Sequence, residues 1–161
     1  MAEPPSVLSS PDHAGVRFPP PLLYVAGLGL GFLLQALWPL PAWSQTVGAL
    51  LALPCLALCV ALCGWAIALF RRFRTSLVPI VPAATLVTRG PYRVTRNPMY
   101  VGLAFLYAGT ALYFRLSWGL LLLPVVLLGI YYLVITREER YLERRFGETY
   151  TRYKAQVRRW L

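Results

Sequence analysis

Charged side chains are scarce in this sequence of 161 residues. They make up 14% of the chain, whereas hydrophobic residues make up 58% and the mean hydropathy is +0.56. A soluble domain of this size could not cover so much apolar surface with so few charges. The composition therefore excludes an ordinary soluble protein and predicts a single integral membrane domain.

The sequence also lacks the pattern of a metal site and an obvious Ser/His/Asp set. His13 is the only histidine, and the three cysteines, Cys55, Cys59 and Cys63, recur every four residues. That spacing puts the thiols on one face of one helix, whereas a metal site needs ligands that converge from more than one element. We therefore expect no metal and no catalytic role for His13, and we interpret the cysteines as small residues on a helix-packing face.

Long apolar runs dominate what is present. Each is about long enough to cross a hydrocarbon core of ~30 Å as a helix. The four runs are Leu22–Trp38, Thr46–Phe70, Met99–Phe114 and Leu116–Thr136. The joint at Arg115 is so short that the last two runs must form an antiparallel hairpin, from whose tip Arg115 can reach the headgroups. The predicted fold is all-α: a polytopic membrane protein with about four transmembrane helices and a C-terminal cytoplasmic helix.

Glycines inside the first run form a GxxxG step at Gly27 and Gly31. No strand precedes them and no acidic residue follows, so a nucleotide-binding loop is not indicated. The pattern predicts close contact between two helices.

Basic residues are concentrated in two places. Of the 16, six lie in the segment 71–98 and eight in the tail 137–161, and four membrane spans place both on one side. By the positive-inside rule that side is cytoplasmic, with both termini inside and the uncharged linker 39–45 outside. We expect an inner-membrane protein that meets anionic lipid or an anionic cofactor, not nucleic acid.

Residues 1–21 read as a flexible lead-in and not as a signal peptide, and 22–161 as one membrane domain.

A turn-rich segment, 89–102, leads into the third run. Pro98 suits the first turn of a helix, and Asn97 can cap it. Free N–H groups at such a helix start can bind a carboxylate or a phosphate. Gly102 lets a flat ligand or a helix backbone approach closely.

An acidic pair, Glu138 and Glu139, follows the fourth run where it leaves the bilayer. Adjacent carboxylates can bind hydroxyls, an ammonium group or a sulfonium-bearing ligand. Together with the N–H groups before the third run, they suit a zwitterionic, ribose-containing cofactor. The alternative is structural: flanking arginines anchor topology, and an acidic pair at a helix exit forms salt bridges with them.

The tail beyond the acidic pair has the pattern of an amphipathic helix. Its apolar residues recur at spacings of three or four, and Gly147 predicts a break between two helical pieces. These apolar positions are Leu142, Phe146, Tyr150, Tyr153 and Val157.

Two motifs resemble the membrane methyltransferases that include isoprenylcysteine carboxyl methyltransferases and phospholipid N-methyltransferases. They read GPYRxxRNPMYxG and EExxLxxxFGxxYxxYxxxVxRW, and the match covers residues 89–161. The resemblance implies methyl transfer from S-adenosylmethionine to a lipid-borne or small hydrophobic acceptor at the cytoplasmic membrane face. It also implies that 89–161 is the cofactor-binding half, with the tail closing over the site.

The residues that the resemblance marks come from both motifs. Cofactor contacts are expected from Tyr92, Arg96, Asn97, Pro98, Met99, Tyr100, Gly102, Glu138 and Glu139, and catalytic or acceptor contacts from Tyr100, Arg144 and Arg145. Carboxyl methyltransferases usually have His where this chain has Asn97, so a histidine contact becomes an amide contact.

Two other functions remain open from the sequence. Membrane steroid-type reductases, which bind a dinucleotide, share an Arg-x-Pro-x-Tyr turn before a terminal hairpin. A non-catalytic membrane scaffold would retain the topology without turnover. The identity of the acceptor, and whether it is attacked at O, N or S, does not follow from these residues.

Overall fold

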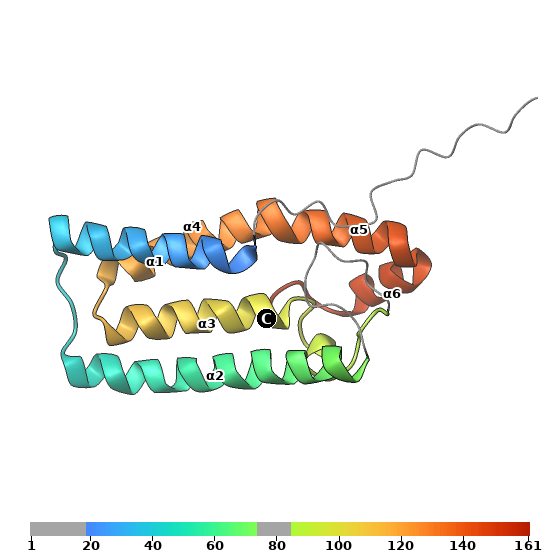
Figure 1. Cartoon of the computed structure of the whole chain (residues 1–161), viewed down its shortest axis with the longest axis horizontal. Coiled ribbons are helices and arrows are strands. Elements are labelled where there is room, and N and C mark those ends of the chain that lie inside the picture. The colour runs from blue at the N-terminus through green and yellow to red at the C-terminus, as the bar shows by residue number, and fades with distance from the viewer. Residues whose placement is uncertain (1–18, 74–84) are drawn as a thin grey trace, which may run out of the picture.

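The computed structural model describes residues 19–73 and 85–161. Predictions that fall on 1–18 and 74–84, which include most of the lead-in, His13 and Arg74, lie outside the described residues. Within them the fold is all-helical, as predicted. In Figure 1, α3 lies in the middle, α2 packs along one side of it, and α1 and α4 pack together on the other side.

The first two helices are α1 (Pro20–Leu37) and α2 (Gln45–Arg72). Proline in the first turn of α1 costs no hydrogen bond, because the first N–H groups of a helix have no intrahelical partner. Ser44 caps the start of α2, and its side chain accepts a hydrogen bond of 3.3 Å from the Val47 N–H. It ends on two arginines, which the negative helix C-terminus favours.

The helical hairpin predicted around Arg115 is confirmed. It consists of α3 (Pro98–Tyr113) and α4 (Ser117–Ile130), joined by a turn in which Arg115 has φ 58°. The Nε of the exposed Arg115 side chain donates a 2.8 Å hydrogen bond to the Trp43 carbonyl. Trp43 in turn donates to the Leu112 carbonyl at 2.8 Å, so the hairpin tip is tied to the α1–α2 linker.

The fourth run continues past the membrane as one long helix. A π-helical turn, η2 (Tyr131–Ile135), joins α4 to α5 (Thr136–Phe146), and α6 (Glu148–Gln156) follows. The predicted break is present, since Gly147 has φ 52° between α5 and α6. About 20 residues fill a hydrocarbon core, so the apolar part, 117–135, crosses it and the charged helix α5 extends beyond.

Three of the described helices are long and apolar enough to cross a membrane: Pro20–Leu37, Gln45–Arg72 and Ser117–Phe146. α3 has 16 residues, about 24 Å of helix, and runs between α2 and α4 (Figure 1). The chain is therefore an integral membrane protein. The uncharged linker and the hairpin turn lie at one end of the bundle, and the end of α2, the start of α3 and the charged helix α5 lie at the other (Figure 1).

Small residues allow the helices to approach closely, as the sequence predicted. A Cβ atom on Gly31 would lie 2.9 Å from the Cα of Gly119 in α4. The cysteine face of α2 packs against α3, because a Cβ on Gly102 would lie 2.5 Å from the Cys63 sulfur. Gly102 therefore serves a helix contact, which is the second of the two roles that the sequence left open for it.

The contact between α1 and α4 gives a direct prediction. Gly31→Ala should destabilise the protein by about 1–3 kcal/mol, because two backbones would have to separate to admit the methyl group. Gly29→Ala is the matched control on the same helix, with nothing within 4 Å of its added Cβ. It should be neutral or stabilising by about 0.5–1 kcal/mol. Thermal unfolding in detergent measures both; equal melting temperatures would contradict the close contact.

Candidate active site

The loop before α3 is held against α2 by a short 3-10 helix, η1 (Gly90–Arg93). Gly90 has φ +61°, and a Cβ there would lie 2.8 Å from Nε1 of Trp65. Tyr92 is buried, with its ring 5.7 Å from that of Phe70. Its carbonyl accepts a 2.8 Å hydrogen bond from the hydroxyl of Tyr153 on α6. The loop is thus fixed to α2 on one side and to the tail on the other.

The C-terminal segment pairs with this loop through backbone and side-chain hydrogen bonds. The Arg96 N–H donates to the Arg158 carbonyl at 2.9 Å. The Arg159 carbonyl accepts two bonds of 3.0 Å, from the Thr95 hydroxyl and from the Asn97 amide. The chain end therefore lies directly beside the start of α3.

The predicted capping role of Asn97 is wrong. Asn97 occupies the N-cap position, but its side chain makes no cap hydrogen bond and instead donates to Arg159. The Asn97 side chain is held by its NH2 group on the tail carbonyl, and its oxygen accepts no hydrogen bond from the first N–H groups of α3. The first N–H groups of α3, including that of Tyr100, therefore lack the partner that a capping side chain would supply.

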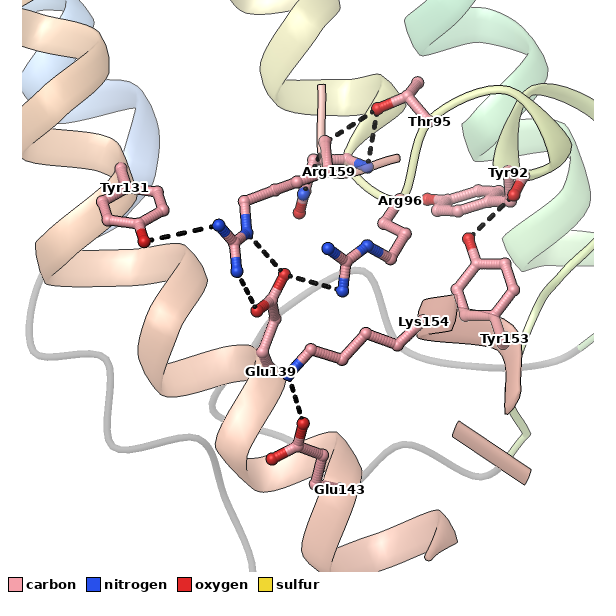
Figure 2. A network of polar contacts seen from close by, with 10 residues as sticks. Tyr92, Thr95, Arg96, Tyr131, Glu139, Glu143, Tyr153, Lys154 and Arg159 are labelled. Atoms are coloured by element: carbon pink, nitrogen blue, oxygen red, sulfur yellow. Dashed lines mark hydrogen bonds and ion pairs between the residues drawn. The ribbon is translucent and has the colours of Figure 1, made fainter. Parts of the chain in front are cut away.

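Glu139 lies at the centre of a polar network shown in Figure 2. Glu139 is only 6% exposed, and its carboxylate binds Arg159 through two parallel bonds of 2.9 and 2.8 Å. Arg96 approaches the same carboxylate at 3.1 Å. Bidentate pairing is the strong form of an arginine–carboxylate contact. Three segments distant in sequence are thereby joined at one side chain.

Tyr131 holds Arg159 from the membrane side. Its hydroxyl accepts a bond of 3.3 Å from the guanidinium, whose carbon lies 4.8 Å from the ring centre. Both a hydrogen bond and a cation–π contact therefore keep Arg159 on Glu139.

The negative charge of Glu139 is compensated within the chain. Burial alone would raise the pKa of Glu139, but hydrogen bonds from Arg159 and the charge of Arg96 outweigh it and lower that pKa. The same contact raises the pKa of Arg159. Glu139 is thus an ionised carboxylate whose charge is already compensated by two arginines.

Glu138 faces a different neighbour. The Tyr100 hydroxyl donates to its carboxylate at 2.7 Å, and the Tyr24 hydroxyl on α1 donates to the Tyr100 carbonyl at 2.9 Å. Burial raises the pKa of Glu138 to about 7, although the Tyr100 bond opposes the shift. No ion pair to Glu138 is recorded among the described residues, so its charge is not compensated as that of Glu139 is.

Three of the predicted site residues lie away from the acidic pair. Met99 packs beside Ala66, Val87 and Tyr92, and so faces α2. Arg144 and Arg145 are exposed on α5, about 9 Å along the helix axis beyond Glu138. The structure brings Arg96, Asn97, Tyr100 and the acidic pair together, and it leaves these two arginines apart.

Three residues of the site received no role from the sequence. Arg159 lies inside the VxRW motif, which was the signal that could have marked it. Tyr131 and Tyr24 sit in apolar runs, where a single tyrosine carries no distinguishing pattern.

A separate cleft of about 350 Å³ lies between the loop and the tail. It is lined by Thr88, Arg93, Tyr153, Gln156 and Val157. Its size is at the low end for small-molecule sites. Neither Glu138 nor Tyr100 lines it, so it does not form part of the site around Glu138.

Comparisons with known proteins identify the family. Residues 47–149 match the phospholipid methyltransferase family. The chain belongs to this family. Its membership implies a membrane methyltransferase, and the match ends before Arg158 and Arg159. A 63-residue stretch is 41% identical to an uncharacterized protein of Haemophilus influenzae, which it covers completely, using 39% of this chain. No solved structure matches significantly.

Metal chemistry was not expected from the sequence. Among residues 19–73 and 85–161, no group of three or more His, Cys, Asp or Glu side chains is placed to hold a metal ion.

The Glu139 network gives a prediction for stability. Glu139→Gln should cost about 3 kcal/mol, because it leaves two partly buried arginines without their anion. Glu148→Gln is the control, since its pair with Arg152 is almost fully exposed and should be worth under about 1 kcal/mol. Thermal unfolding at pH 7 compares them.

The pH dependence follows from the lowered pKa of Glu139. Its contribution is complete above the ordinary glutamate pKa of about 4.3 and is lost as pH falls through the lower folded-state value. The melting temperature of the wild type should therefore decline below about pH 4 more steeply than that of Glu139→Gln. Parallel declines would show that the network does not carry this stability.

Proposed function

We propose that this protein is an S-adenosylmethionine-dependent methyltransferase that acts on a lipid-borne or small hydrophobic acceptor at the cytoplasmic membrane face. The observation that carries the proposal is the pairing of Glu138 with Tyr100 at the uncapped start of α3. An uncompensated carboxylate and free N–H groups occur there together. The family provides the reaction class, and this arrangement supports S-adenosylmethionine as the cofactor.

The groups present fit the charged groups of the cofactor. The Nε of Arg96 is buried and has no hydrogen-bond partner among the described residues. That N–H and the first N–H groups of α3 would hold the cofactor carboxylate. Glu138 would hold the ammonium group or lie near the sulfonium. Residues 89–161 would form the cofactor-binding half of a single membrane domain.

When bound, S-adenosylmethionine supplies a methyl group activated by its sulfonium. The protein then needs only to position and orient the two reactants and to exclude water. Tyr100 fixes the rotamer of Glu138 through its hydroxyl, and Tyr24 fixes the backbone of Tyr100. A carboxylate acceptor needs no base, and an amine acceptor needs only to arrive unprotonated.

Glu139 has a different role in this proposal. Its charge is neutralised by Arg96 and Arg159, so it would not compete for the cofactor ammonium. It holds the loop and the tail around the site. Met99 and Gly102 face α2, so we leave them out of the cofactor contacts.

The acceptor would enter sideways from the membrane. Each CH₂ group exposed to water costs ~0.8 kcal/mol, so a lipid chain does not cross an aqueous mouth cheaply. The cofactor would arrive from the cytoplasm, with both termini on that side of the inner membrane. Arg144 and Arg145, exposed on α5, would hold an anionic group of the acceptor.

Cofactor binding is the first test. S-adenosylmethionine and S-adenosylhomocysteine should each raise the melting temperature, with about 2.7 kcal/mol of stabilisation at a hundredfold excess over Kd. A shift with a nicotinamide dinucleotide alone would favour a reductase. No shift with any of these ligands would favour a non-catalytic scaffold.

The role of Glu138 predicts a pH dependence of that binding. The ionised carboxylate attracts the cationic cofactor and the protonated form does not, so affinity should rise as pH increases through about 7. Glu138→Gln should remove the rise and weaken binding at pH 8 by ~1.5–3 kcal/mol. Calorimetry measures both, with Glu148→Gln as the control. An unchanged pH profile in Glu138→Gln would remove Glu138 from the cofactor site.

Acceptor binding by α5 is tested with vesicles. Arg144→Ala and Arg145→Ala should each lower turnover of an anionic lipid acceptor about tenfold, because a charged hydrogen bond is lost, and leave cofactor affinity unchanged. Arg152→Ala, on the neighbouring helix α6, is the matched control. If both variants only weaken vesicle association, the arginines are membrane anchors.

A further inference from the structure

The π turn η2 lies directly between the membrane-spanning part of the fourth helix and the acidic pair. An α-helix advances about 100° per residue, so a regular helix would place Glu139 about 80° away from Tyr131 and Glu138 about 20° away. In a regular helix, Glu138 would therefore lie on the same face as Tyr131.

A π turn changes this register. It closes i→i+5 hydrogen bonds and so holds about one residue more than an α-helical turn. Counted in α-helical steps, Glu139 then lies only about 20° from Tyr131, and Glu138 lies about 120° away. The contacts agree with this, since Tyr131 and Glu139 bind one guanidinium while Glu138 reaches Tyr100 on α3.

We propose that the π turn assigns the two adjacent carboxylates to their separate partners, and that Tyr131 is the positioning residue that keeps Arg159 on Glu139. Glu139 thereby closes the tail onto the loop, and Glu138 stays directed at Tyr100. The inference rests on the proposed function for the ligand that Glu138 receives. The pairing itself concerns only this chain.

Double-mutant cycles test the assignment. Tyr131→Phe removes the hydroxyl that accepts from Arg159 but keeps the ring beneath its guanidinium. It should weaken S-adenosylhomocysteine binding roughly fivefold in the wild-type background and less than twofold in Glu139→Gln, because both changes act through Arg159. In Glu138→Gln the effect of Tyr131→Phe should remain undiminished. Equal coupling to both glutamates would overturn the proposal.

Tyr132→Phe is the matched control, because the neighbouring tyrosine is 65% exposed and should couple to neither glutamate. The same cycles can be measured as melting temperatures without ligand. These measurements test the register assignment independently of the proposed cofactor. If S-adenosylhomocysteine fails to bind the wild type but the thermal coupling to Glu139 persists, the proposed function fails and the register assignment stands.

A helix-length pair tests the π turn itself. Deleting Leu133 places Glu139 seven positions after Tyr131 in a regular helix, which keeps the two residues within about 20° of each other. Tyr131 should still couple to Glu139 in this variant. Inserting one alanine after Leu133 should make Tyr131 couple to Glu138 instead. If the deletion abolishes the coupling to Glu139, or if a folded insertion variant retains it there, the π turn does not set the assignment.

Discussion

The site depends on the ion network around Glu139. This carboxylate, on the helix that leaves the membrane, binds Arg96 from the loop before α3 and Arg159 from the C-terminal segment (Figure 2). A buried carboxylate is costly to desolvate, and the bidentate Arg159 and the nearby Arg96 offset that cost. With the tail fixed, the Arg159 carbonyl also takes the amide of Asn97, which leaves the start of α3 without a side-chain cap.

The separation of two neighbouring carboxylates follows from the same geometry. The arginines that compensate Glu139 lower its pKa, whereas burial raises the pKa of Glu138 to about 7. Titratable groups whose environments push their pKa values apart are typical of sites with divided roles. Here the difference arises from helix register, because adjacent residues on a helix point about 100° apart.

Hydropathy predicted the membrane helices closely. The run Met99–Phe114 became Pro98–Tyr113, and the break at Gly147 was found where the sequence placed it. The site was predicted only in outline. Pattern reasoning assumes a regular helical period, so it could not locate the π turn or say which glutamate would meet the arginines. It assigned a cap to Asn97 because propensity ignores a competing carbonyl 62 residues away.

Amide hydrogen exchange at the junction of loop and tail tests the central claim most directly. The Arg96 N–H donates to the Arg158 carbonyl, so its exchange reports whether the tail is docked. The account predicts slow exchange of this amide in the wild type and in Glu148→Gln, and fast exchange in Glu139→Gln. Equal protection in all three proteins would show that the tail docks without the Glu139 network and would contradict the account.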